Sequence, residues 1–141
     1  MKLRRYILVL ALFSVLFTGI FPVMAQEAVA EDLVARLDEY LTNELPPAWG
    51  NVSVEDLSLE LMEMAPVLVD VRNPSEWDEV GHIEGAVLAP VKDLMMNLDI
   101  LPADLDAPIV VYCAKGTRGQ FAMITLQVLG YSNVRNLKGG I

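Results

Sequence analysis

The chain has 141 residues, which is enough for one domain of ordinary size. It carries 19 acidic against 10 basic residues, a net charge of −9, and so repels nucleic acid and anionic membrane surfaces. Its single cysteine excludes an internal disulfide, and one cysteine with one histidine cannot fill a tetrahedral zinc site without carboxylates. We therefore expect no nucleic-acid partner, no metal and no cofactor.

The first 25 residues have the layout of a secretory signal peptide. Three basic residues near the N-terminus precede an uncharged run from Tyr6 to Gln26, and a Val-x-Ala sequence predicts cleavage after Ala25. The same run is nearly long enough to span a bilayer, so an uncleaved membrane anchor at residues 6–25 is the alternative. Both interpretations predict an exported domain, periplasmic or secreted, with membrane attachment only in the second case.

Residues 26–50 are predicted to form an amphipathic helical extension and a proline-rich linker. Over residues 28–43, apolar and acidic side chains alternate with the period of one helix. Residues 45–50 contain two prolines, which end the helix and form the linker. We expect the apolar stripe to pack on the main domain; docking to a partner protein is the alternative.

Residues 51–141 are predicted to form the main domain, in which helices and strands alternate. Ser53 is suited to cap a helix of about three turns, and residues 66–72 read as a buried strand. The further predicted elements are a helical turn at 75–80, a strand within 81–90, a helix at 91–98, a strand at 109–112, a helix at 119–129 and a strand at 134–137. This alternation predicts an α/β fold, a small parallel sheet flanked by helices on both faces.

The sequence around Cys113 carries the strongest chemical signal. A strand ends at Cys113, a loop containing Gly116 follows, and a helical pattern begins at Gly119. This order puts the sulfur over the N-terminal end of a helix, where unpaired backbone N–H groups favour a thiolate or another anion. Lys115 and Arg118 add two positive charges. The pattern indicates an anion cradle with a nucleophile at its base; a cysteine that is only a small buried hydrophobe is the alternative.

Five motifs in order resemble those of a single-domain rhodanese. They lie at 68–72, 76–77, 81–86 with Pro90, 112–118 and 136–141. The resemblance covers residues 52–141 and implies a rhodanese-like parallel sheet with sulfurtransferase activity. A thiolate would take the outer sulfur of a small anionic donor such as thiosulfate, hold it as a persulfide and pass it to a thiol or cyanide acceptor.

The resemblance also implies roles for the residues of the loop. Cys113 is the catalytic nucleophile, the loop amides cradle the persulfide and the departing sulfite, and Lys115 and Arg118 attract the donor. The residues expected to bind substrate are Ala114, Lys115, Gly116, Thr117, Arg118, Gly119 and Arg72.

Two polar residues outside the loop invite a functional interpretation. Arg72 reaches the loop or pairs with Asp70 or Glu76, and we favour pairing. His82 is the only histidine, but the resemblance implies a structural Gly-His-Ile turn remote from the sulfur rather than a general base.

Two features depart from the family pattern. Position 119 is Gly, where the family often has a Ser or Thr that caps the helix. The sequence stops at Ile141, where the family normally continues into a Trp-bearing segment that closes the domain. Two expectations follow: the sequence is a fragment truncated at its C-terminus, or residues 28–43 cover the exposed part of the core.

Two other functions compete with sulfur transfer. Cys-based phosphatases also place cysteine in an anion-binding loop, but with five residues between Cys and Arg; here four residues separate Cys113 from Arg118, and Tyr112 stands where phosphatases usually have His. The second alternative is a non-catalytic rhodanese-fold module for binding or redox sensing. Such modules typically lack the cysteine, so the presence of Cys113, Gly116 and Arg118 favours chemistry.

Overall fold

The computed structural model describes residues 31–63 and 65–141. The predicted signal peptide or membrane anchor at 1–25 lies outside these residues, and no helix inside them combines the length and hydrophobicity needed to cross a membrane. The chain separates after Thr42 into two units. In the first, residues 31–39 are helical and lead into a π-helical turn at Tyr40–Glu44, as predicted for that part of 28–43. The packing of this helix stays a prediction.

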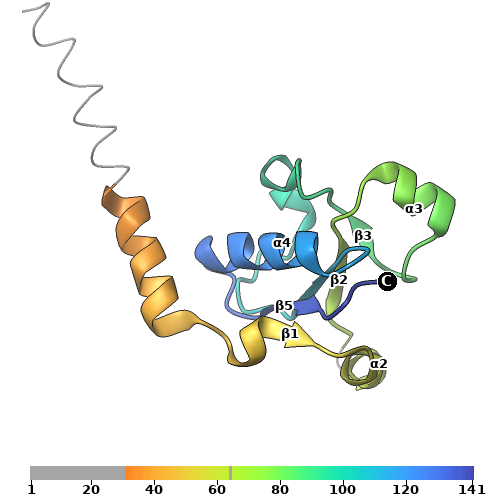
Figure 1. Ribbon diagram of the computed structural model, residues 1–141, viewed down its shortest axis with the longest axis horizontal. Helices are drawn as coiled ribbons and strands as arrows, with labels where there is room; N and C mark the ends of the chain where they lie inside the picture. The colour runs from red at the N-terminus through yellow and green to blue at the C-terminus, as the bar shows by residue number, and fades with distance from the viewer. Residues whose placement is uncertain (1–30, 64) are drawn as a thin grey trace, which may run out of the picture. The chain divides into compact units, whose positions relative to one another are not determined.

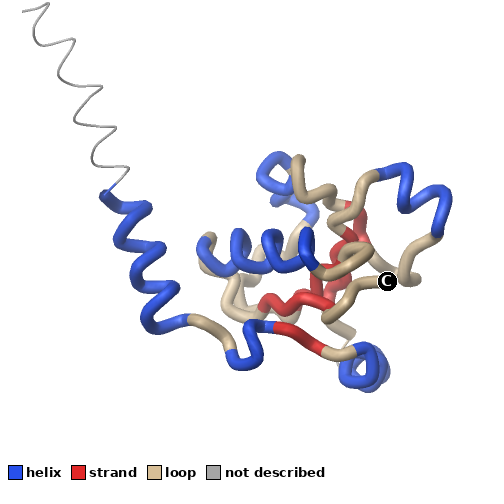
Figure 2. Tube along the Cα trace, viewed as in Figure 1, coloured by secondary structure: helices blue, strands red, loops and turns tan. Residues whose placement is uncertain are grey.

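The second unit is built on a parallel five-stranded sheet, which confirms the predicted fold class. The strands are β1 (Asn51–Val52), β2 (Val67–Asp70), β3 (Val87–Leu88), β4 (Ile109–Tyr112) and β5 (Val134–Leu137). Their order is β1-β5-β4-β2-β3, and all neighbouring pairs are parallel. The strands are the red segments of the tube in Figure 2. β1 was not predicted: it has only two residues and is added to the edge of the sheet by pairing with β5.

Helices cover both faces of the sheet (Figure 1). They are α2 (Val54–Glu63) on one face and α4 (Thr117–Val128) on the other, whereas α3 (Pro74–Val80) follows β2 and has no buried residue. The Ser53 hydroxyl accepts a hydrogen bond from the Asp56 amide at 3.0 Å, which confirms Ser53 as the cap of α2. At α3 the cap is Asn73, whose backbone N–H donates to the Glu76 carboxylate at 3.1 Å while its backbone carbonyl accepts from the Glu76 amide at 3.0 Å.

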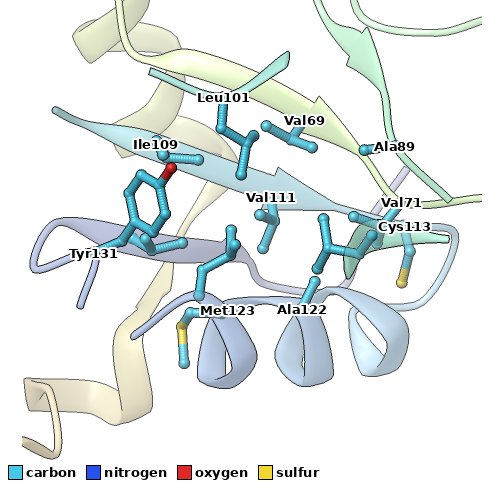
Figure 3. Packing of buried hydrophobic residues seen from close by; sticks show 13 residues of the cluster. Val69, Val71, Ala89, Leu101, Ile109, Val111, Cys113, Ala122, Met123 and Tyr131 are labelled. Atoms are coloured by element: carbon cyan, nitrogen blue, oxygen red, sulfur yellow. The ribbon is translucent and has the colours of Figure 1, made fainter. Parts of the chain in front are cut away.

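Alternation along β4 divides the interior into two apolar clusters. Ile109, Val111 and Cys113 belong to the cluster on the α4 side of the sheet, drawn in Figure 3. Val110 and Tyr112 belong to the cluster on the other side, which includes Leu57 of α2. All four residues of β4 are fully buried, as expected for the central strand of a sheet covered on both faces.

The helix predicted at 91–98 is wrong. A turn and two short 3₁₀ helices, Leu94–Met96 and Leu98–Ile100, occupy this region. Hydrogen bonds from Asp93 to Pro90 and from Met96 to Asp93 span three residues each, which is the tighter 3₁₀ pattern. The apolar spacing suggested a helix with one buried face, but Met95 and Met96 are exposed and do not contribute to such a face. The strand predicted within 81–90 is also shorter, with only Val87–Leu88 paired.

Candidate functional site

Connections at the carboxyl edge of the sheet bring the site residues together. From β2 the chain proceeds to β3 on one side, and from β4 to β5 on the other. Parallel α/β sheets bind ligands where neighbouring strands diverge in this way. Asp70 ends β2 and Cys113 directly follows β4, so both lie at this point.

The Cys113 sulfur lies between the apolar core and the first turn of α4. Cys113 is only 1% exposed and belongs to the α4-side cluster. Figure 3 shows its side chain at the end of that cluster, beside the start of the helix. The Gly119 amide donates to Sγ at 3.4 Å. The sulfur is therefore buried, but on the helix side it contacts a backbone donor rather than hydrocarbon.

Gly116 shapes the loop that follows Cys113. Its backbone is left-handed (φ +81°, ψ −23°), a region that favours glycine, and it occupies the N-cap position of α4. A Cβ on Gly116 would lie 3.2 Å from the Gly139 amide nitrogen. The Gln120 amide donates to the Gly116 carbonyl at 2.9 Å and starts the helix. Conformation and available space both require glycine here.

The C-terminal residues pack against the same loop. The Ile141 amide donates to the Cys113 carbonyl at 2.9 Å. Gly140 has φ +71°, and a Cβ there would overlap the Cys113 carbonyl oxygen. At Gly140 the backbone thus approaches the cysteine loop too closely for a side chain, whereas at Gly139 only the left-handed backbone, with φ of +85°, favours glycine.

Arg118 is held by an acid from the opposite side of the site. Its guanidinium donates to both carboxylate oxygens of Glu76 in α3, at 2.6 and 2.7 Å. This pairing, together with the Asn73 amide, lowers the pKa of Glu76 to about 2. Glu76 in turn raises the pKa of Arg118, to which the nearby Cys113 sulfur also contributes. Sequence reasoning missed this pair because 42 residues separate its members.

Arg72 is buried and pairs with Asp70, which agrees with the expectation that it pairs with a nearby acid rather than reaching the loop. Its Nη2 donates to Asp70 Oδ2 at 2.6 Å and to the Gly81 carbonyl at 2.7 Å. The guanidinium carbon lies 5.9 Å from the centre of the Tyr112 ring. Burial raises the pKa of Tyr112 to about 12, and its hydroxyl accepts from the Ile83 amide at 3.1 Å. Arg72 thus fixes the chain around α3, and donor binding by it stays a prediction.

The other predicted site residues differ in exposure. Lys115 and Thr117 are exposed, and Ala114 is half-buried. His82 is exposed and stacks on the Trp77 ring, with centroids 3.5 Å apart and planes 8° from parallel. Within residues 31–63 and 65–141, no three His, Cys, Asp or Glu side chains are grouped to hold a metal ion.

Comparison with known proteins gives one consistent family. The family model described as "Rhodanese-like domain" matches residues 53–141. A "Sulfurtransferase" of Allochromatium vinosum is 36% identical over 93 residues, covering 65% of this chain and 84% of the relative. The similar solved structures include a human single-domain sulfurtransferase, with 31% identity and a TM-score of 0.59, covering 65% of this chain and 91% of that one.

Other relatives are much longer proteins. A tRNA uridine(34) hydroxylase of Erwinia tasmaniensis is 40% identical over 79 residues, which are 53% of this chain but only 22% of the relative. The chain therefore spans about a fifth of that protein. The relatives named sulfurtransferase support a sulfurtransferase-type enzyme. The match over residues 53–141, with the fold and the cysteine loop, shows that this chain belongs to the rhodanese-like domain family.

Proposed function

We propose that the domain transfers sulfane sulfur through a persulfide on Cys113, with thiosulfate as a competent donor. The Cys113 thiolate attacks the outer sulfur of thiosulfate, a new S–S bond forms at Cys113, and the old S–S bond breaks with its electron pair leaving on sulfite. An acceptor thiolate or cyanide then attacks the outer persulfide sulfur, and Cys113 leaves as thiolate. Both steps balance without an external oxidant or reductant.

The hydrogen bond from the Gly119 amide to Sγ is the observation that carries this proposal. A fixed N–H donor favours the thiolate and the persulfide anion over neutral forms. Cys113 also contributes to the raised pKa of Arg118, although the guanidinium itself pairs with Glu76. The burial of Cys113 supports the same chemistry, because it keeps water and stray thiols away from a stored persulfide.

Mass spectrometry of the purified domain after incubation with thiosulfate tests the proposal. We expect Cys113 to gain the mass of one sulfur atom, to lose it when cyanide is added, and to gain nothing in Cys113→Ser. The alternative is a non-catalytic rhodanese-fold module for binding or redox sensing. A thiol that stays unmodified by thiosulfate while an alkylating agent still reaches it would decide for that module.

The acceptor proposed for this chain is a thiol or cyanide rather than RNA. Some relatives are named tRNA uridine(34) hydroxylases, but this chain covers only 22% of the one described above. Its net charge of −9 opposes binding to a polyanion. Sulfur transfer to a small thiol, followed by mass spectrometry of both partners, would support this choice.

Export of the domain belongs to the same proposal and rests on the sequence of residues 1–25. If the segment is a signal peptide, the protein recovered from a periplasmic or secreted fraction should begin at Gln26. Recovery of the intact chain in the membrane fraction would favour the anchor at 6–25. A full-length chain in the cytosolic fraction would contradict export altogether.

A further inference from the structure

A buried side chain connects three elements beneath the cysteine loop. Asn136 lies on β5 and is 2% exposed. Its Nδ2 donates to Asn51 Oδ1 on β1 at 2.9 Å and to Gln120 Oε1 in the first turn of α4 at 3.3 Å. The carboxamide therefore ties that turn to two neighbouring strands of the sheet.

The oxygen of the same carboxamide lies against Gly119. An ideal Cβ on Gly119 would overlap Asn136 Oδ1. The backbone of Gly119 does not require glycine, because the residue lies inside α4 and is not among those with positive φ. Space alone excludes a side chain here, and Asn136 takes that space.

Asn136 Oδ1 is also unusual in its hydrogen bonding. It is buried, and no donor in the described part of the chain reaches it. Leaving a buried carbonyl oxygen without a partner costs free energy, so such groups are rare and call for an explanation. The two bonds from Nδ2 supply one, because they orient the carboxamide and leave Oδ1 directed at Gly119.

Gly119 is the residue whose amide donates to Cys113 Sγ at 3.4 Å. Asn136 therefore packs against the residue that supplies the N–H donor to the sulfur. We infer that Asn136 is a positioning residue, which holds the first turn of α4 so that the Gly119 amide meets the reactive sulfur. The inference deepens the proposed function and rests on it for the identity of the reaction.

Four proteins test this inference: the wild type, Gly119→Ala, Asn136→Ala and the double variant. Three quantities are measured on each protein. The first two are the melting temperature and the rate at which iodoacetamide alkylates Cys113 at pH 7. Cys113 is the only cysteine, so alkylation reports on this sulfur alone. The rate of sulfur uptake from thiosulfate is the third readout. All rates are measured well below the lowest melting temperature.

The melting temperatures should show a reversal of sign. In the wild type, Gly119→Ala should lower the melting temperature, because the new methyl group overlaps Asn136 Oδ1. In the Asn136→Ala background the same substitution should raise it, because alanine favours a helix over glycine once the space is free. A decrease of equal size in both backgrounds would overturn the spatial coupling.

The rates separate positioning from packing. We expect Asn136→Ala and Gly119→Ala each to slow alkylation and sulfur uptake, on the order of tenfold for loss of one aligned donor. Adding Gly119→Ala to Asn136→Ala should change both rates less than about twofold, because the two act on one hydrogen bond. Variants that melt lower but keep wild-type or faster rates would reduce Asn136 to a packing residue. If even the wild type takes no sulfur from thiosulfate, the proposed function fails, while alkylation and melting still decide the role of Asn136.

Discussion

Glu76 binds the Arg118 guanidinium through both carboxylate oxygens, at 2.6 and 2.7 Å, and so joins α3 to the first turn of α4. α3 follows β2 and α4 follows β4, and these two strands are neighbours in the sheet. After α3 the chain continues to β3 on one side, and after α4 it continues to β5 on the other. The pair therefore spans the point where the chain diverges around Cys113. It also neutralises one of the two cations that the sequence assigns to donor attraction.

The first prediction concerns the pH dependence of this pair. The pKa of Glu76 lies at about 2 in the folded protein, below its ordinary value of 4.5, so folding favours the ionised carboxylate. Its stabilising contribution is complete above pH 4.5 and disappears as the pH falls toward 2. Glu76→Gln should thus lower the free energy of unfolding at pH 6 by on the order of 1 kcal/mol or less, because the pair is partly exposed.

Urea unfolding at pH 6, 4 and 2.5 measures this difference. Glutamine still serves in a capping box, so the substitution removes mainly the charge. Glu79→Gln, which changes an exposed acid of the same helix, is the control and should alter stability little. A difference between wild type and Glu76→Gln that stays constant from pH 6 to 2.5 would contradict the assignment.

The second prediction uses two glycines with nearly the same positive φ. Gly116 and Gly85 have φ of +81° and +79°, but a Cβ would contact the Gly139 amide only at Gly116. Alanine at either position should cost roughly 1–2 kcal/mol of stability through left-handed strain. Only Gly116→Ala should also slow sulfur uptake, on the order of tenfold or more, because it displaces the loop that precedes the Gly119 donor.

Chemical denaturation and the thiosulfate reaction, measured on both variants, separate strain from chemistry. Equal losses of sulfur uptake in Gly85→Ala and Gly116→Ala would mean that strain alone explains the effect. Full activity in Gly116→Ala would mean that the loop does not need its present shape.

Local sequence patterns predicted much of this fold because they act over a few residues. The apolar runs at β2 and β4 and the Ser53 cap each specify one element, and the structure has all three. The region 91–98 failed because its apolar spacing fits a helix, yet Met95 and Met96 point to solvent and give a helix nothing to pack. The periodicity of apolar residues shows that a helix could form an apolar face, but it does not show whether the sheet offers a surface for that face to pack on.

The sequence predicts those parts of the site that consist of consecutive residues. It does not predict the contacts between residues that are far apart in the chain. The order of strand, cysteine, Gly116 and helix is visible in the sequence, and the left-handed Gly116 agrees with it. Asn136 and Gly119 are 17 positions apart, and their contact depends on the register of β5 beside β4. Gly119 stands out in the sequence as a departure from the family pattern, whereas Asn136 is only the first residue of the motif at 136–141 and no role could be assigned to it.

The third prediction concerns the buried pair beneath the site. Asp70 is 0% and Arg72 1% exposed, and they are joined by hydrogen bonds of 2.6 to 2.9 Å. Asp70→Ala leaves a buried guanidinium without its carboxylate, a change that costs about 3–5 kcal/mol. Urea unfolding at pH 7 measures the loss. Asp78→Ala, at an exposed position of α3, should stay within about 0.5 kcal/mol of wild type. A cost below 1 kcal/mol for Asp70→Ala would mean that Arg72 finds another partner or reaches water.

The last prediction concerns how an anionic donor finds a buried sulfur in an acidic protein. Glu76 already pairs with Arg118, whereas Lys115 is an exposed cation of the same loop. Long-range attraction by an exposed cation is screened by salt. Sulfur uptake from thiosulfate should therefore slow as salt rises, and Lys115→Gln should lower kcat/KM a few-fold at low salt and weaken the salt dependence. Lys92→Gln makes the same change of charge at an exposed position outside the loop and should leave both nearly unchanged. An unchanged salt dependence in Lys115→Gln would mean that Lys115 does not attract the donor and that Arg118 does. Glu76→Gln should then strengthen the attraction, because it releases the Arg118 guanidinium from its carboxylate partner.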